Sequence, residues 1–583
     1  MIKKFNLKAL ATIVVITTLL ASCGVNKMIK KANTVKYEAT PKVLETNGGK
    51  ISIAINGEIP AKYFNKKAFV EITPVLKYKD GSETLKSITL KGEKAEGEGI
   101  VINTKTGGKF SYNDIIDYKP AMNNSILEIN PKVSLKKKSA ELGKVKLADG
   151  VIYTSTRTQN VGNTIIANHG YEKETIITKK ADIYFAKNLA NINMRLALNK
   201  NKNSKEAITE LCNFISQGWK IKNIEINAWA SPEGEESFNQ GLSEKRAKTT
   251  TKYLNRLFKR LNRKKGSLLT VKNPEKEVEF NTYAKGEDWN GFLKAVNASE
   301  ISDKNSILNV INSQIDVNKK EQEIRDMSLV YKEIENNILP ELRRGEIIIN
   351  CFEPKKTDEE IAELSTTNPE ALDIYELLYS ATLTKDLNIK NKIYKAAATL
   401  NPKCWKAYNN AGIINLKLGN NAEAEKYLSK ANKIAPNNAK IINNLGCLAL
   451  SNKNFKKAES YFLNAKKLGV NENMNLGIIA IRKANYNKAV NLLKDNECTY
   501  NLALAQLLNG NNSKAAQTLK CAPENAETFY LLAVVGARTN NESMLLENLK
   551  KAVDANNSLK EIAGEDREFI NYFDNAEFQK IIK

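Results

Sequence analysis

The sequence predicts a multidomain protein with an N-terminal β-sandwich, a central α/β domain and a C-terminal all-α solenoid. Three observations support this prediction. Apolar and polar residues alternate in the first part, strands alternate with helices in the middle, and helical segments repeat with a fixed period at the end. The expected boundaries are a signal peptide at 1–22, a tether at 23–35, the sandwich at 36–180, the α/β domain at 181–354 and the solenoid at 355–583.

The first 22 residues have the pattern of a secretory signal. Lys3 and Lys4 precede an apolar run from Leu10 to Leu20, which is shorter than the roughly 20 residues of a membrane span. The end of this run, Leu20-Ala21-Ser22-Cys23, resembles the lipobox of bacterial lipoproteins. The resemblance implies cleavage before Cys23, palmitate and other acyl chains on that residue, and an outer-membrane protein that faces the periplasm. A plain signal peptide with a chance cysteine is the alternative.

Composition limits the partners and the chemistry. The formal net charge of +24 favours acidic partners, but secretion argues against nucleic acid. A single histidine, His169, excludes a histidine-rich metal site, so we expect neither a metal nor a cofactor. The six cysteines after Cys23 have no C-x-x-C spacing. We interpret most of them as buried thiols, with a disulfide as the alternative in an oxidising compartment.

The first part of the mature chain contains two segments that differ in pattern. Residues 24–35 are basic and lack structure signals, which indicates a tether. Segments such as "KISIAING" and "AFVEITPVLKYKDG" then alternate apolar and polar residues between glycine-rich turns. We therefore expect one antiparallel sandwich, or two small ones, over 36–180. No chemistry is evident in this domain.

The central domain is expected to contain four strands and two long helices. The helix over 203–218 has a stripe of apolar residues at helical spacing. The second helix, over 239–261, is strongly basic; its lysines and arginines are either a solvated face or a surface for acidic polymer. The predicted strands are "ADIYFA", "KIKNIEINAWA", "KEVEFNTYAKG" and "GEIIINCFE".

The C-terminal part repeats with a period of 34 residues. Ala411-Gly412, Ala424 and Ala431 reappear 34 residues later as Leu445-Gly446, Ala458 and Ala465. Looser copies follow at 476, 502 and 532. This pattern is similar to tetratricopeptide repeats, in which small residues allow two helices to cross closely. The resemblance implies a solenoid with a concave face that binds envelope proteins.

The helix that follows the second strand carries a second resemblance. Asn239-Gln240-Gly241-Leu242-Ser243, then Arg246-Ala247 and Tyr253-Leu254, resemble the OmpA-like peptidoglycan-binding domain. The family implies that Arg246 binds a carboxylate of the diamino acid in the wall peptide, because its planar fork matches a carboxylate. It also implies that Asn239 shapes the loop that enters the helix.

The loop before this helix departs from the family. The usual aspartate, eight residues before Asn239, is Ser231, which has no charge. Glu233 could supply the carboxylate instead, in a loop that Pro232 and Gly234 reshape. The predicted ligand-binding residues are Ser231, Glu233, Asn239 and Arg246. Two alternatives stay open. Either this domain binds a ligand other than the diamino acid, or Arg246 only forms a surface ion pair with Glu235 or Glu244.

These features together look like those of envelope lipoproteins of Gram-negative bacteria. The first hypothesis is a scaffold that links the outer membrane to peptidoglycan and binds protein partners through its repeats. The second is an assembly factor of a secretion, gliding or fimbrial machinery whose OmpA-like domain no longer binds glycan. A wall hydrolase that uses Glu233 or Glu236 is a third, but the sequence has no G-x-S-x-G or H-E-x-x-H motif, and we expect no enzyme.

Overall fold

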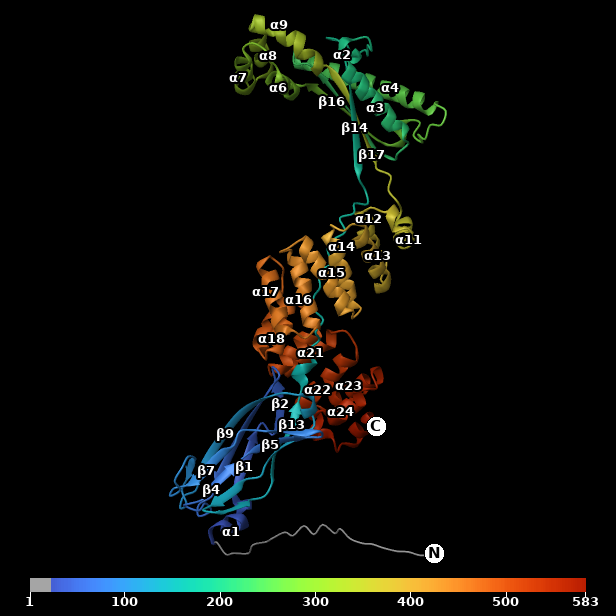
Figure 1. The fold of residues 1–583 in the computed structure, drawn as a ribbon. Coiled ribbons are helices and arrows are strands. Elements are labelled where there is room, and N and C mark those ends of the chain that lie inside the picture. Colours follow the sequence, from blue (N-terminus) through green and yellow to red (C-terminus); the bar gives the residue numbers. More distant parts are fainter. Residues whose placement is uncertain (1–22) are drawn as a thin grey trace, which may run out of the picture. The chain divides into compact units, whose positions relative to one another are not determined.

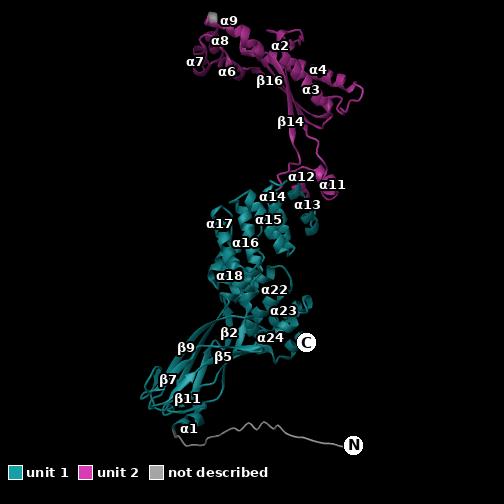
Figure 2. Ribbon diagram, viewed as in Figure 1, with its two compact units in different colours: residues 1–168, 384–583 teal, residues 169–383 magenta. Residues whose placement is uncertain are grey.

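The computed structural model describes residues 23–583, which form two compact units (Figure 2). Unit 1 contains the described residues up to 168 together with 384–583, and unit 2 contains residues 169–383. Unit 2 is therefore an insertion: the chain leaves unit 1 after Asn168 and re-enters it at Thr384. The predicted signal peptide and the first three lipobox residues lie outside the described residues.

Residues 23–35 are not the unstructured tether that the sequence suggested. Helix α1 (Cys23–Lys30) and a 3-10 turn (Ala32–Thr34) occupy this segment. Val25 and Met28 are buried in the core of the sheet-rich domain, and α1 packs against strands β11 and β12. Val25 and Met28, three positions apart, lie on one face of the short helix and dock it against the sheets. Because lysines surround this pair, the sequence shows no apolar stripe.

Two sheets form the N-terminal domain of unit 1 (Figure 1). The larger sheet has the order β1-β3-β2-β13-β10-β5-β6, with β9 also paired to β3, and the smaller has the order β12-β11-β4-β7-β8. Val70 from the small sheet and Phe110 from the large one share a core. The pairs β2–β13 and β7–β8 are parallel, so the purely antiparallel prediction is wrong for them. The strands are β1 (Lys36–Thr40), β2 (Val43–Asn47), β3 (Lys50–Ile59), β4 (Phe69–Ile72), β5 (Pro74–Tyr78), β6 (Gly81–Thr84), β7 (Ile88–Gly92), β8 (Ile100–Ile102), β9 (Gly108–Asp117), β10 (Ser125–Ile129), β11 (Lys132–Leu135), β12 (Lys138–Glu141) and β13 (Val145–Ile152).

The C-terminal part of unit 1 is a tetratricopeptide-type solenoid, as predicted. Its small residues lie where paired helices cross: a Cβ on Gly412 would be 2.6 Å from Leu428, and one on Gly446 would be 2.5 Å from Phe462. The helices are α13 (Leu387–Leu400), α14 (Trp405–Lys417), α15 (Asn421–Ile434), α16 (Ala439–Ser451), α17 (Phe455–Lys467), α18 (Asn473–Arg482), α19 (Tyr486–Leu493), α20 (Tyr500–Leu508), α21 (Asn512–Cys521), α22 (Ala526–Arg538), α23 (Glu542–Ala555), α24 (Leu559–Glu565) and α25 (Ala576–Ile582).

Unit 2 contains a four-stranded sheet in the order β14-β17-β15-β16. Only β15 and β16 are parallel. Helices α3 and α4 share a core with β14, β15 and β17, in which Leu211, Ile226 and Phe258 are buried. The strands are β14 (Ile176–Tyr184), β15 (Ile221–Ala230), β16 (Glu279–Glu287) and β17 (Arg344–Phe352); the helices are α2 (Ala197–Lys200), α3 (Lys202–Ser216), α4 (Glu236–Asn262), α5 (Pro274–Glu277), α6 (Trp289–Ala298), α7 (Lys304–Ser313), α8 (Val317–Asp326), α9 (Ser328–Asn337), α10 (Leu339–Leu342), α11 (Asp358–Thr367) and α12 (Ile374–Ser380).

The four predicted strands and two predicted helices of the central domain are present, but its boundary moves. Strand β14 starts at Ile176 and pairs with β17, so residues 176–180 belong to unit 2 and not to the sandwich. Across the described part of the chain, none of the helices combines the length and the apolar character that crossing a bilayer would require.

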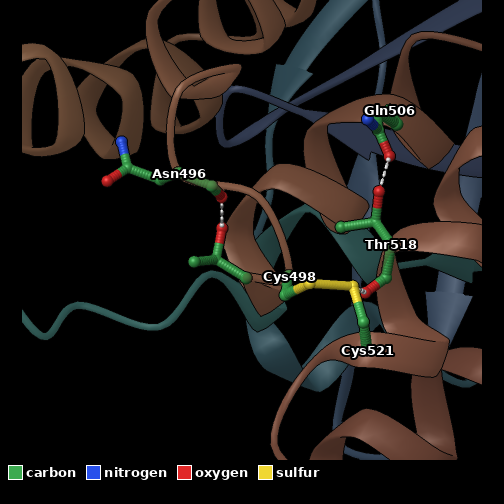
Figure 3. Close-up of a disulfide and its surroundings, with 6 residues drawn as sticks. Asn496, Cys498, Gln506, Thr518 and Cys521 are labelled. Atoms are coloured by element: carbon green, nitrogen blue, oxygen red, sulfur yellow. Dashed lines mark hydrogen bonds between the residues drawn. A yellow bond between two sulfur atoms is a disulfide. The ribbon is translucent and has the colours of Figure 1, made fainter.

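Two of the cysteines form a disulfide. Cys498, before α20, is bonded to Cys521 at the end of α21 (Figure 3). Nearby, the Thr518 hydroxyl donates a hydrogen bond to Gln506 at 2.8 Å. Cys351 and Cys447 are buried thiols, whereas Cys212 and Cys404 are half-buried. The prediction of buried thiols is therefore confirmed for Cys351 and Cys447. Cys498 and Cys521 follow the alternative, a disulfide.

We expect Cys498→Ser to lower the free energy of unfolding of unit 1 by about 3 kcal/mol, because the bond closes a loop between residues 23 positions apart. Urea unfolding with and without a reductant measures this change. Reduced wild type should match the variant, and Cys404→Ser should behave like wild type. A variant that is as stable as the oxidised wild type would contradict the prediction.

Candidate functional site

The loop between β15 and α4 turns its acidic residue inward. The Glu233 side chain is only 5% exposed, and its carboxylate forms an ion pair with Arg343 at 2.7 Å and another with Lys187 at 3.2 Å. The Ser231 hydroxyl donates a hydrogen bond to the same carboxylate at 2.5 Å. Glu233 therefore provides the carboxylate that Ser231 lacks, but its charge is compensated within the chain.

Arg246 is fully buried, with 0% exposure. Its Nε, Nη1 and Nη2 donate hydrogen bonds to the backbone carbonyls of Leu189, Trp229 and Ala186 at 3.1, 2.9 and 3.2 Å. Burial, reinforced by the nearby Arg343, lowers the pKa of Arg246 to about 10, so the group stays protonated at neutral pH. The guanidinium is directed at the protein's own backbone, neither at an open pocket nor at Glu235 or Glu244.

Asn239 is also engaged within unit 2. Its Nδ2 donates a hydrogen bond to Glu287 Oε1 at 2.7 Å, and the indole of Trp289 donates to the other oxygen at 2.9 Å. The sequence thus identified residues that lie around one loop and one helix start. In the described structure, each of these four side chains has polar partners within unit 2.

The sequence analysis missed one acid at this loop. Glu321, from α8, accepts a hydrogen bond from the Gly234 backbone N–H at 3.0 Å and pairs with Arg325 at 3.1 Å. Burial and the charge of Glu287 raise the pKa of Glu321 to about 7. The contact joins residues 87 positions apart, and no local pattern in the sequence indicates it.

This raised pKa predicts a pH dependence of stability. The folded protein keeps a proton on Glu321 up to about pH 7, whereas the unfolded chain releases it near pH 4.5. The free energy of unfolding should therefore fall as the pH rises through this window. We expect Glu321→Gln, which mimics the protonated acid, to match wild type at pH 4 and to be more stable at pH 8. Urea midpoints of unit 2 test this, with the exposed Glu323→Gln as control; equal midpoints for Glu321→Gln and wild type at pH 8 would contradict it.

A second candidate site lies in the solenoid. Residues 158–168, here called the strap, run along the first helices of the repeats without forming a helix or strand (Figure 1). Four asparagines, one each from α14, α16, α18 and α20, bind strap residues through both backbone groups. The pairs are Asn501–Gln159 (N–H to Oδ1 3.0 Å, Nδ2 to carbonyl 2.9 Å), Asn475–Asn163 (2.7 and 3.4 Å), Asn444–Ile165 (2.8 and 2.9 Å) and Asn410–Ala167 (2.8 and 3.0 Å).

Neighbouring asparagines hold this ladder in place. Asn409 and Asn443 donate to the Oδ1 atoms of Asn410 and Asn444 at 3.1 and 3.0 Å. Asn475 in turn donates to Asn443 Oδ1 at 2.8 Å. All of these side chains are buried, so each polar atom needs its partner, and the network fixes the amides in a binding orientation.

The ladder recognises backbone rather than side chains. Three of its contacts fall on strap residues 163, 165 and 167, which is the two-residue period of an extended chain. The Val161 side chain is 76% exposed. Gly162 is restricted by its surroundings, because a Cβ there would lie 2.7 Å from Cys447 Sγ. Thr158 and Ala167, near the two ends of the strap, are buried. The groove therefore suits an extended peptide with a glycine at one position, small side chains near its ends and half-buried or exposed side chains between them.

Charged residues anchor the strap at its N-terminal end. Arg482 donates to the Thr158 carbonyl at 2.9 Å. Just before the strap, Arg157 pairs with the fully buried Asp566 at 2.8 Å and lies 4.1 Å above the Tyr530 ring. The Tyr530 hydroxyl also donates to Asp566, at 2.8 Å.

A second ion pair joins the sheet-rich domain to the last repeats. Arg538 bridges Glu45 of β2 and Glu568 at 2.8 and 2.6 Å. Because all of these residues belong to unit 1, the sheets, the strap and the solenoid are connected in one body.

The sequence did contain a signal for the ladder. An asparagine directly precedes the small-residue pair in four successive repeats: Asn410-Ala411-Gly412, Asn444-Leu445-Gly446, Asn475-Leu476-Gly477 and Asn501-Leu502-Ala503. The pairs reveal the 34-residue period, and the asparagine before each pair marks the ladder. The expectation of an open binding face is corrected over residues 159–167, which occupy it.

Comparison with known proteins gives similarity at the level of the repeats. No protein-family model matches the chain, and no curated protein matches it. A tetratricopeptide repeat protein from Parabacteroides merdae is 15% identical, with 37% of this chain and 91% of that one covered and a TM-score of 0.30. PilW, a type IV pilus biogenesis factor, is 16% identical over 40% of this chain and 100% of its own, with a TM-score of 0.27. Yeast Tom70 is 15% identical over 60% and 78%, with a TM-score of 0.26.

Proposed function

We propose that this chain is a non-catalytic scaffold of the bacterial outer membrane, lipid-anchored and facing the periplasm, that binds protein partners through the asparagine ladder of its repeats. The observation that carries the proposal is the set of buried asparagines that hold both backbone groups of an extended segment. Such recognition of the main chain is how proteins bind extended peptides with little dependence on sequence. The strap is then the resident occupant that a partner segment replaces.

The strap has an advantage over any partner, because it is part of the same chain. A tethered segment acts at an effective concentration in the millimolar range, so a free peptide competes poorly unless the strap is weakened. Gly162 offers a way to weaken it. A valine there would clash with Cys447 and lift the strap, while the asparagines stay in place.

The test uses a labelled peptide with the sequence of residues 158–168. We expect Gly162→Val to bind it at least about tenfold more tightly than wild type does. Adding Asn444→Ala should remove this binding, and Val161→Ala should behave like wild type. Hydrogen exchange confirms that the variants remain folded. If folded Gly162→Val does not bind the peptide, the ladder is a permanent internal clamp and partner binding through it is wrong.

The proposed scaffold does not hold peptidoglycan through Arg246. A diamino acid would need this cation for its carboxylate, but all three donor nitrogens are bonded to carbonyls. This supports the hypothesis of an assembly factor whose OmpA-like domain no longer binds glycan. Wild type and Arg246→Lys, which keeps the charge, should sediment equally with purified sacculi at moderate salt. Loss of sedimentation in a folded Arg246→Lys would restore the wall-linking hypothesis.

The lipid anchor is a separate prediction. We expect Cys23→Ser to abolish incorporation of labelled palmitate and to move the protein from the membrane fraction to the soluble one, because the lipobox provides a single acceptor. Fractionation of cells that express each form measures this, with Cys212→Ser as control. Palmitate retained in Cys23→Ser would contradict it.

A further inference from the structure

A cavity of about 480 Å³ lies on unit 2 between α4 and the loop before α2, apart from the residues predicted to bind a ligand. This size falls within the range of about 300–1,000 Å³ for small-ligand sites. The lining side chains are Asn191, Ile192, Met194, Thr249, Tyr253, Arg256, Leu257 and Arg260.

Two cations in this cavity lack internal partners. Arg256 and Arg260 are one helical turn apart on the stripe of α4 that also carries Tyr253. Both arginines are exposed, and within residues 23–583 neither has a hydrogen bond or an ion pair. Three other arginines of unit 2, Arg325, Arg343 and Arg344, are by contrast paired with acids. Two free guanidinium groups beside a hollow are suited to an anion.

The opposite wall of the cavity is held in place. Arg246 bonds the carbonyls of Ala186 and Leu189 just before this loop. At its far end, the buried Asn199 donates to the Asn193 carbonyl at 3.0 Å. Arg246, which resembles a ligand-binding residue, thus holds the loop that forms one wall of a different cavity. The α4 residues of that cavity lie about one to four helical turns after Arg246.

The lining indicates which anion fits. None of the lining residues is acidic, so an ammonium group, as in a diamino acid, has no counter-charge. The side chains of Ile192, Met194 and Leu257 offer apolar surface next to the arginines. Asn191 and Thr249 can form hydrogen bonds to a peptide group. We propose that this cavity binds the C-terminal carboxylate of a peptide whose last residue is apolar.

The test compares two fluorescein-labelled pentapeptides ending in Leu-Phe, one with a free carboxylate and one with a C-terminal amide, by fluorescence anisotropy with the full chain. We expect the carboxylate form to bind and the amide to bind at least about tenfold more weakly. Arg256→Gln and Arg260→Gln should each weaken binding of the carboxylate form, and the double variant should remove it. Lys259→Gln, which removes one exposed charge of the same helix outside the cavity, should leave it within about twofold.

Several outcomes would overturn the proposal. Equal binding of acid and amide, an equal loss in Lys259→Gln, or no binding of either peptide would each do so. Inorganic phosphate or vesicles of an anionic phospholipid that bind through Arg256 and Arg260 while the peptide does not would assign the cavity to phosphate instead. Because both arginines are exposed, their substitution should leave the fold intact, which circular dichroism checks.

Discussion

Replacing Arg246 by alanine should destabilise unit 2 by about 3–5 kcal/mol, because it leaves buried carbonyls without a charged donor and opens a cavity. The affected carbonyls are those of Ala186, Leu189 and Trp229. Lysine at this position should recover part of the loss, since it keeps the charge but has no planar fork. A ligand-binding arginine at an open site would cost far less stability when removed.

Hydrogen exchange resolved along the chain measures this effect in the intact protein. Amides of the loop after β14 and of β15 should exchange faster in Arg246→Ala, while those of the solenoid should not change. Arg256→Ala, an exposed arginine of the same helix, is the matched control and should exchange like wild type. If Arg246→Ala were as stable as this control, the guanidinium would not have the structural role assigned to it.

The second large effect is expected from Asn444→Ala. This substitution removes the partner of the Ile165 N–H, one of the two amides that donate to the Ile165 carbonyl, and one hydrogen bond to Asn409. Asn409 still donates to that carbonyl at 3.3 Å. Each buried group left unpaired costs about 1–3 kcal/mol, so the strap should open about 100-fold more readily. Arg157 and its ion pair with Asp566 should still anchor the segment before it.

Exchange rates of the amides at 163–167 test this prediction. They should increase strongly in Asn444→Ala, with little change in the sheets of the N-terminal domain. Asn464→Ala, an exposed asparagine on α17 of the same repeat, is the control. Unchanged rates in Asn444→Ala would show that the ladder does not hold the strap.

Periodic features were predictable from the sequence, and contacts across long distances were not. The strands of unit 2 and the 34-residue repeat follow from side-chain periodicity, which local sequence records directly. The inward turn of Glu233 depends on Arg343, 110 positions away. The resemblance to a ligand loop could therefore indicate which residues lie together. It could not indicate that Arg343 would pair with Glu233, or that backbone carbonyls would accept the hydrogen bonds of Arg246.

The strap illustrates the same limit. Its own sequence lacks the alternation of a strand, because the groove holds it through hydrogen bonds to its backbone. The sequence contains the asparagines that contact the strap, but their role as hydrogen-bonding partners depends on an extended segment about 280 positions earlier in the chain. The α1 helix was missed for a different reason, since a single apolar pair is too short a pattern to stand out.

The insertion of unit 2 has a consequence for proteolysis. Because the chain crosses between the units twice, a protease that cuts once between Asn168 and Ile176 leaves unit 2 covalently joined to the solenoid. The two fragments would separate on a denaturing gel but elute together under native conditions, held by the asparagines and the Arg157 ion pair. Releasing unit 2 from the rest of the molecule takes a second cut, so a single accidental cut in this segment would not by itself divide the protein.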